Sequence, residues 1–301
     1  MAQLVKLQDY ISRYEKDIYH YPSQYIRLKK ENWENLLQTW EQQKEERQIE
    51  HMEEVQENNF YKWKRFFQRR ENVESEAEES DSLLTIPHSK KELIQYFVDT
   101  LLPFQFKWAS TTVSEMSFFD KAYYDDFTLK YFLQRFPDTY LLFYQPVFQL
   151  KNSPMEGDVI LISPIGLEII KIVEFNSTIT LVPGVDRAWY KEENNVQTRI
   201  LNPLLSIKRT EKIIRSILSK YDVDFPIEKV VLSRTNAIDF SSEPYHTKFV
   251  GKAQHEKWLQ DKRLLVSPLK HKQLKVAELI LRHCYTSSIH RPEWEDEIDL
   301  Y

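Results

Sequence analysis

The stretch MEGDVILISPIGLEIIKIVEF, from Met155 to Phe175, decides the fold that this sequence predicts. Asp158–Ser163 is mostly apolar and does not alternate, as is typical of a strand buried on both faces. Pro164-Ile165-Gly166 supplies turn residues, and Leu167–Phe175 returns as a second strand. The stretch therefore predicts a β-hairpin with an acid near its start and a lysine among acids near its end.

The turn sets which residues of the hairpin face each other. If Ser163 and Gly166 flank a two-residue turn, Lys171 lies opposite Asp158, and a longer turn would shift the partner by one residue. Glu168 and Glu174 stand an odd number of residues from Lys171, so their side chains should point to the opposite face of the strand. A β-bulge would add one residue and turn Glu174 toward the face of Lys171.

Composition bounds the classes of protein that this chain can belong to. With 301 residues, of which 42% are hydrophobic and 29% charged, it can form one large domain or two modest ones with a sizeable core. It has 4 glycines and contains neither GxGxxG nor GxxxxGK[ST], which argues against nucleotide-binding enzymes of those classes. The net charge of −5 means that any binding of nucleic acid must come from a local patch.

Three features predict a cytoplasmic protein that makes no membrane contact. The opening MAQLVKLQDY lacks the basic and apolar regions of a signal peptide. No apolar run approaches the ~20 residues of a membrane-spanning helix. Cys284 is the one cysteine, which excludes an intrachain disulfide and suits a reducing compartment.

Residues 1–80 are predicted to form a helical region that ends in an acidic linker. Apolar residues recur three or four apart in two stripes, as on one face of a helix. The first stripe comprises Leu4, Leu7, Ile11, Tyr14 and Ile18, and the second comprises Trp33, Leu36, Leu37 and Trp40. The linker, residues 71–81, contains six acids and no base. We expect a long helix or a helical hairpin, coiled-coil-like, that contacts an unknown protein partner or a second copy of the chain.

Two signals flank this linker. Before it, YKWKRFFQRR (61–70) interleaves bases with aromatic residues, which is typical either of a grip on a nucleic-acid strand or of a packed helix end. After it, Ser89 and Glu92 form a Ser-x-x-Glu capping box. This box predicts a connecting helix within residues 81–116, and Pro103 is expected to end it.

Residues 117–260 are predicted to form an α/β domain. An amphipathic helix (128–136) precedes a strand (139–150), the hairpin and a second strand pair near 178–190. A helix led by Asn202-Pro203 and the buried strand KVVLS (229–233) follow. The order helix, strand, strand, strand, helix, strand is an α/β arrangement. Residues 261–301 are expected to contain a C-terminal helix and an acidic tail.

This order resembles the nuclease-related domain (NERD) of the PD-(D/E)XK nuclease superfamily over about Ser117–Gln260. In that family a helix with an early acid and a strand precede a hairpin that carries Asp on one strand and Glu-x-Lys on the next. Asp158 falls on the hairpin Asp, Asn202-Pro203 on the helix start, and Asp125 or Asp126 nearest the early acid. The resemblance implies a PD-(D/E)XK-like mixed sheet flanked by helices, with a carboxylate-bound divalent cation.

One departure from the family motif decides the functional prediction. The family's Glu-x-Lys aligns with Lys171-Ile172-Val173, so a cation stands where a metal-binding carboxylate should be. We expect Lys171 to neutralise Asp158, with no cofactor, in a degenerate site that binds rather than catalyses. The alternative is a divergent nuclease in which Asp158, Asp126 or Asp125, and a relocated Glu174 or Glu168 bind Mg²⁺ or Mn²⁺, while Lys171 acts on the attacking water.

A basic stripe on the helix led by Asn202 offers a separate hypothesis. Lys208, Lys212 and Arg215 follow at i, i+4 and i+7, so they share one helix face that could contact phosphates. A solvated helix face is the other interpretation of such a run, and Glu211 dilutes its charge. Nucleic acid is therefore retained as a candidate partner of the domain.

Overall fold

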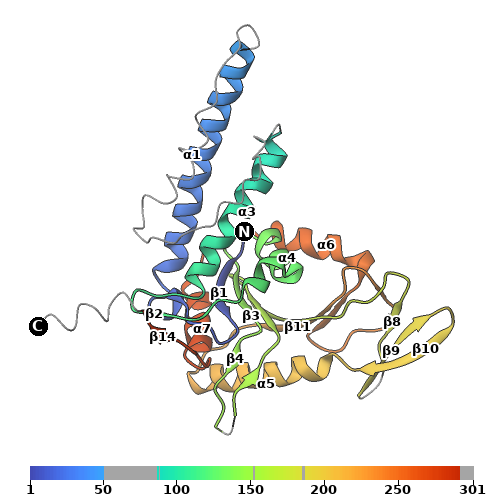
Figure 1. Ribbon diagram of the computed structural model, residues 1–301. Helices are drawn as coiled ribbons and strands as arrows, with labels where there is room; N and C mark the ends of the chain where they lie inside the picture. The colour runs from blue at the N-terminus through green and yellow to red at the C-terminus, as the bar shows by residue number, and fades with distance from the viewer. Residues whose placement is uncertain (51–86, 88, 152, 185–186, 292–301) are drawn as a thin grey trace, which may run out of the picture. The chain divides into compact units, whose positions relative to one another are not determined.

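A computed structural model describes residues 1–50, 87, 89–151, 153–184 and 187–291 (Figure 1). It comprises two compact units, one formed by Met1–Arg27 with Thr100–Tyr301 and the other by Leu28–Asp99. The basic-aromatic segment 61–70, the acidic linker and the acidic tail lie outside the described residues. Six α-helices and a mixed sheet among the described residues confirm the predicted mixed α/β class.

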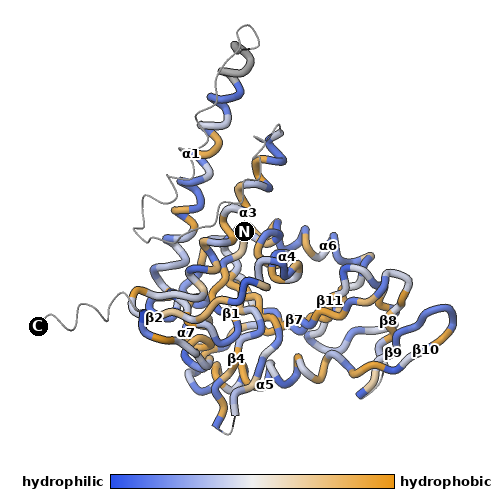
Figure 2. Tube along the Cα trace, in the orientation of Figure 1, coloured by the Kyte–Doolittle hydropathy of each residue, from blue (hydrophilic) through white to orange (hydrophobic). Residues whose placement is uncertain are grey.

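The larger unit is built on a six-stranded mixed sheet (Figure 1). In spatial order its strands are β1 (Gln3–Leu7), β3 (Leu141–Tyr144), β6 (Val159–Ile162), β7 (Leu167–Ile172), β11 (Ile227–Leu232) and β13 (Thr247–Val250). β3, β6 and β7 are antiparallel neighbours, whereas β1, β11 and β13 are each added in parallel. Every residue of β3 and β6 is buried, which explains why these strands are continuously apolar. Figure 2 shows hydrophobic colouring at β7 and β11, whose sequences, LEIIKI and IEKVVL, also contain charged residues.

Helices contact the two faces of this sheet. One face carries Val159, Leu161 and Ile170, which share a core with α4 (Phe127–Arg135) and α6 (Lys252–Arg263). The other face contacts α5 (Leu204–Lys220), which also contacts α7 (His271–Leu281). α1 (Tyr21–Glu50) and α3 (Lys90–Trp108) contribute residues to both units. None of the described helices is long and apolar enough to cross a membrane.

A second, four-stranded sheet takes three of its strands from the segment between β7 and α5 and its fourth from the segment after β11. Its order is β10 (Val196–Leu201), β9 (Ala188–Glu193), β8 (Thr180–Val182) and β12 (Ala237–Ile238). Two short ribbons complete the strands, β2 (Glu115–Met116) with β14 (Ile289–His290) and β4 (Val147–Phe148) with β5 (Met155–Glu156). The single-turn helices η1 (Arg13–Glu15) and η2 (Lys121–Asp125) lie in connecting segments.

The start of the chain corrects the predicted N-terminal helix. Residues Gln3–Leu7 form strand β1, and η1 follows, so the helical spacing of Leu4 and Leu7 was misleading. The physical reason is that β1 is buried at all its positions, and such a strand does not show the alternation that identifies a half-buried one. Even Lys6 is fully buried, where it donates hydrogen bonds to the carbonyl of Tyr10 (2.7 Å), Glu15 Oε1 (2.6 Å) and Thr286 Oγ1 (2.6 Å).

The connecting helix begins as predicted and ends later than predicted. Ser89 Oγ accepts the N–H of Glu92 at 3.2 Å and donates to Glu92 Oε1 at 3.0 Å, which confirms Ser89 as the predicted cap of the helix. Pro103 lies inside α3 rather than at its end. A proline removes one backbone hydrogen bond of a helix, but the residues beyond it, Phe106 and Trp108, are buried, and their burial favours continuation.

The smaller unit confirms the second apolar stripe. Leu36 and Trp40 are buried, and the ring of Trp33 lies 5.2 Å from that of Phe97 between ring centroids. The indole N–H of Trp40 donates to the carbonyl of Pro87 at 2.7 Å. Both contacts fall within Leu28–Asp99.

The open edge of β1 depends on one glutamine. Gln105 accepts the N–H of Leu4 at 2.7 Å and donates to the carbonyl of Ala2 at 3.0 Å, and all three residues are buried. We expect Gln105→Leu to lower the free energy of unfolding by about 2–4 kcal/mol, because two buried backbone groups lose their partners. Gln95→Leu, at an exposed position of the same helix, should cost under about 0.5 kcal/mol. Urea denaturation of the two variants measures this difference, and equal costs would contradict the role given to Gln105.

Candidate functional site

The hairpin of β6 and β7 has the register that a two-residue turn predicts. Ile162 pairs with Leu167 and Val159 pairs with Ile170, which places Asp158 opposite Lys171. Lys171 Nζ lies 3.0 Å from Asp158 Oδ1. The structure therefore brings two of the predicted site residues into a direct ion pair.

Helix α5 completes the environment of Asp158. Thr210 Oγ1 accepts the N–H of Asp158 and donates to Asp158 Oδ2, each at 3.2 Å. The side chain of Asp158 is 5% exposed and that of Lys171 is 43% exposed, so the carboxylate is buried while the ammonium group reaches solvent. The two carboxylate oxygens of Asp158 thus contact different groups, Oδ1 the ammonium group of Lys171 and Oδ2 the hydroxyl group of Thr210.

Glu168 lies on the other face of β7, as its odd separation from Lys171 predicts. It is buried and forms an ion pair with Lys262 of α6, while its Oε2 has no hydrogen-bond partner among the described residues. Burial raises the pKa of Glu168 above the usual carboxyl value, and Lys262 opposes this effect. This side chain therefore stays away from Asp158 and is paired with a different cation.

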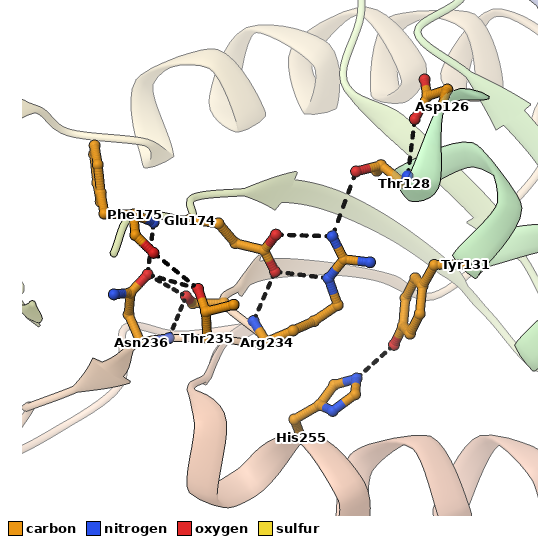
Figure 3. A network of polar contacts seen from close by, with 10 residues as sticks. Asp126, Thr128, Tyr131, Glu174, Phe175, Arg234, Thr235, Asn236 and His255 are labelled. Atoms are coloured by element: carbon orange, nitrogen blue, oxygen red, sulfur yellow. Dashed lines mark hydrogen bonds and ion pairs between the residues drawn. The ribbon is translucent and has the colours of Figure 1, made fainter. Parts of the chain in front are cut away.

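Glu174 is held by Arg234, just beyond the ends of β7 and β11 (Figure 3). Arg234 donates from Nε to Glu174 Oε1 at 2.6 Å and from Nη2 to Oε2 at 2.7 Å, and its backbone N–H adds a third bond at 2.9 Å. Burial disfavours the charge on Glu174, but these hydrogen bonds outweigh burial and hold its pKa below the usual value. No bulge brings Glu174 to Lys171.

Asp126 joins the same polar network through Thr128 (Figure 3). As the N-cap of α4, Asp126 Oδ1 accepts the N–H of Thr128 at 2.8 Å, and its Oδ2 accepts the hydroxyl of Tyr144 at 2.6 Å. Thr128 Oγ1 in turn accepts Arg234 Nη2 at 3.5 Å. Asp126 and Glu174 thus belong to one network, with the guanidinium group of Arg234 between them.

Two aromatic contacts extend this network toward α6. The guanidinium carbon of Arg234 lies 4.8 Å from the centroid of the Tyr131 ring, a cation–π contact. The hydroxyl of Tyr131 lies 2.7 Å from His255 Nε2. Burial lowers the pKa of His255 below its ordinary value, with Glu256 opposing and Arg234 reinforcing this effect, which favours the neutral imidazole.

The predicted catalytic residues are thereby divided between two faces of the sheet. Asp158 and Lys171 lie against α5, whereas Asp126 and Glu174 lie with α4 and Arg234. Within the described residues, no three His, Cys, Asp or Glu side chains are grouped as a metal site would require. As arranged, Asp158 faces an ammonium group where a divalent cation would need a second carboxylate.

The basic stripe on α5 is only partly available to a ligand. Arg215 Nη2 lies 2.8 Å from Glu211 Oε1, and Lys229 Nζ lies 3.2 Å from Glu211 Oε2. Burial disfavours the charge on Glu211, but these two cations hold its pKa below the usual value. Lys208 and Lys212 are exposed, and neither has an ion-pair partner in the described part of the chain.

Thr210 and Arg234 are two contributing residues that sequence reasoning missed. Thr210 lies between Lys208 and Lys212 in the sequence and is buried. The signal that could have identified it is a polar residue at a buried position of the helix. Arg234 follows the strand KVVLS directly, but nothing in the sequence links it to Glu174, because the two residues meet only when β7 and β11 pair in parallel.

Comparison with known proteins gives one short similarity. No family model matches the chain, and no solved structure matches it. A 45-residue segment is 53% identical to an RNA 2',3'-cyclic phosphodiesterase of Geobacillus stearothermophilus. That segment covers 15% of this chain and 14% of the phosphodiesterase.

The pairing of Glu174 with Arg234 predicts a pH-dependent contribution to stability. We expect Glu174→Gln to lower the free energy of unfolding by about 2–3 kcal/mol at pH 7, because charge-assisted hydrogen bonds are lost. Since the pKa of Glu174 is lowered in the folded protein, this contribution is present above the unfolded-state pKa and is lost as the pH falls. Thermal unfolding should therefore show the gap between wild type and variant closing from about pH 5 to about pH 3.

A matched control is the exposed pair of Lys248 and Glu228, whose Nζ and Oε2 atoms lie 2.8 Å apart. Glu228→Gln should change stability by less than about 1 kcal/mol, since exposed ion pairs contribute little. A gap for Glu174→Gln that persists unchanged to pH 3 would contradict the ionised pair with Arg234.

Proposed function

We propose that residues 117–260 form a NERD-type domain of PD-(D/E)XK-like fold whose hairpin site is catalytically degenerate, and that the protein acts in the cytoplasm as a binding module. The observation that carries this proposal is the 3.0 Å contact between Lys171 Nζ and Asp158 Oδ1. In the family that the sequence resembles, a metal-binding carboxylate occupies the position of Lys171.

The order of elements supports the family assignment. α4, β3, β6, β7, α5 and β11 follow each other as helix, three antiparallel strands, helix and strand, with β11 parallel to β7. This is the order that the resemblance implies. The strands β8, β9 and β10, which lie between β7 and α5 in the chain, are then an insertion into that core.

The ion pairs of three carboxylates support the proposal that the hairpin site no longer binds a metal ion. Asp158, Glu168 and Glu174 could each have supplied an oxygen ligand, but each is paired with its own cation: Lys171, Lys262 and Arg234. A hard cation such as Mg²⁺ needs several oxygen ligands at one point, and displacing Lys171 would free only Asp158. The lysine acts as an internal counter-ion that stabilises the buried carboxylate.

The exposed bases on α5 favour a phosphate backbone as the ligand of this module. Lys208 and Lys212 lie one helical turn apart and are not neutralised by described acids, whereas Arg215 is paired with Glu211. A protein partner, or self-association through the N-terminal helices, remains the other kind of interaction that we propose for the chain.

A divergent metal-dependent nuclease is the second candidate. The observation that favours it is the 45-residue similarity to a protein named RNA 2',3'-cyclic phosphodiesterase, which covers 15% of this chain. Such an enzyme would use Asp158 with Asp126 or Glu174 and would bind Mg²⁺ or Mn²⁺. It requires a rearrangement that brings residues from the two faces of the sheet to one cation.

Metal titration separates the two candidates. We expect no saturable binding when Mg²⁺ and then Mn²⁺ are titrated into the protein by calorimetry, because Lys171 neutralises Asp158. Lys171→Glu should create a site with roughly millimolar affinity for Mn²⁺, since it places two carboxylates opposite each other. The double variant Asp158→Ala, Lys171→Glu is the matched control and should not bind. Metal-dependent cleavage of DNA or RNA by the wild-type protein, lost in Asp158→Ala, would establish the nuclease instead.

Salt dependence tests the basic surface of α5. Fluorescence anisotropy with a labelled single-stranded RNA should show that Lys208→Glu, Lys212→Glu weakens binding and reduces the slope of log K against log salt by about 1.4, or about 0.7 for each lost phosphate contact. The control Lys252→Glu, Lys257→Glu makes the same charge change at exposed positions of α6 and should leave the slope unchanged. Equal losses in the two variants would show that only net charge matters.

A further inference from the structure

β10 is an edge strand whose outward backbone groups can be identified from one hydrogen bond. The N–H of Asn202 donates to the carbonyl of Arg187 at 3.0 Å, just past the end of the β9–β10 ladder. In an antiparallel ladder, residues that bond to the neighbouring strand alternate with residues that point away from it. Gln197, Arg199 and Leu201 therefore direct their N–H and C=O groups away from β9.

At the edges of the six-stranded sheet, unlike at β10, side chains form hydrogen bonds with outward backbone groups. At β1, Gln105 caps the outward groups of Ala2 and Leu4. At β13, the N–H of Phe249 donates to Glu243 Oε1 at 2.7 Å. Within the described chain, no side chain or loop caps the outward backbone groups of β10. Figure 1 shows β9 and β10 projecting from the body of the larger unit, so this edge is accessible.

The side chains of β10 also lack the devices that protect open edges. The strand is regular along its six residues, VQTRIL, with no proline and no bulge in its pairing with β9. Val196 is 64% exposed and Leu201 is 70% exposed. Its one charged residue is Arg199. An uncapped, exposed and partly apolar edge of this kind is a template for another strand.

We propose that β10 pairs with β10 of a second copy of this chain, antiparallel and about a twofold axis at Thr198. In this register the outward groups of Gln197 meet those of Arg199 in the second copy, so four backbone hydrogen bonds form across the axis. Val196 lies opposite Ile200 of the second copy, Thr198 lies opposite itself, and no charge faces a like charge. The two four-stranded sheets become one continuous sheet.

Charge and chain direction exclude the two registers whose axes lie beyond Thr198 toward the end of the strand. A twofold axis at Arg199 would place this arginine directly opposite its own copy, and like charges in that position destabilise a sheet. An axis at Ile200 would carry Val196 beyond the end of the second strand, where the chain turns toward α5. The register about Thr198 keeps the whole pairing within β10 and the turn that precedes it.

Disulfide trapping tests both the dimer and its register. Thr198→Cys, in a Cys284→Ser background, should cross-link on mild oxidation, because a non-hydrogen-bonded antiparallel pair has Cα atoms about 4.5 Å apart, within disulfide range. Arg199→Cys in the same background is the matched control and should not cross-link, since its copy is then two residues removed along the second strand, about 7–8 Å away. Faster cross-linking of Arg199→Cys than of Thr198→Cys would overturn the proposed register.

Sedimentation velocity over a range of concentrations tests the role of the backbone. Arg199→Pro removes an N–H that points away from β9, so the hairpin keeps its own hydrogen bonds while each dimer loses two of its four. The dissociation constant should rise roughly 30-fold, whereas Arg199→Ala, which keeps the N–H, should dimerise like the wild type. A monomer at all concentrations, or a dimer that Arg199→Pro leaves unchanged, would overturn the proposal. Circular dichroism confirms that both variants are folded.

Discussion

Burial of the central strands on both faces is the constraint on which the rest of the structure depends. β3 and β6 expose no residue, and β7 is buried over its first four positions. Ionisable groups can then lie only at strand ends or beside a partner of opposite charge. Asp158, Glu168 and Glu174 follow this rule, because each has a cation within reach. The charge pattern around β7 is thus a requirement of the buried core.

The same constraint explains how the candidate site is divided. Alternate residues of β7 face opposite layers of helices, so Lys171 meets Asp158 and Thr210 on one side while Glu168 meets Lys262 on the other. An active site built from Asp158 and Glu174 would need these residues on one face. The polar network of Arg234 with Asp126 and Glu174 gives the second face a stable arrangement of its own.

The local sequence was sufficient to predict the hairpin and its register, but it was insufficient to predict the residues that surround the hairpin. The Ser163–Gly166 turn predicted the register, and apolar runs and caps predicted β11, α4 and α5, because these depend on short-range geometry. The strand β1 was mistaken for a helix, since a fully buried strand shows no alternation, and its partner β3 lies far along the chain. Thr210 and Arg234 were missed for a related reason, because each meets its carboxylate across segments that the sequence does not connect.

The buried contact of Lys6 with Thr286 has a consequence for how the chain folds. Because Lys6 and Thr286 are 280 positions apart in the sequence, this ammonium group cannot reach one of its three hydrogen-bond acceptors until the segment between them has been made. β1 also cannot form its hydrogen bonds until β3 has been made, because this parallel partner is separated from it by more than a hundred residues. Contacts of such long range slow folding, and an unpaired β1 leaves an apolar strand exposed during synthesis on the ribosome. The hydrogen bonds of β1 and of Lys6 are therefore completed only after the segments that contain β3 and Thr286 have been made.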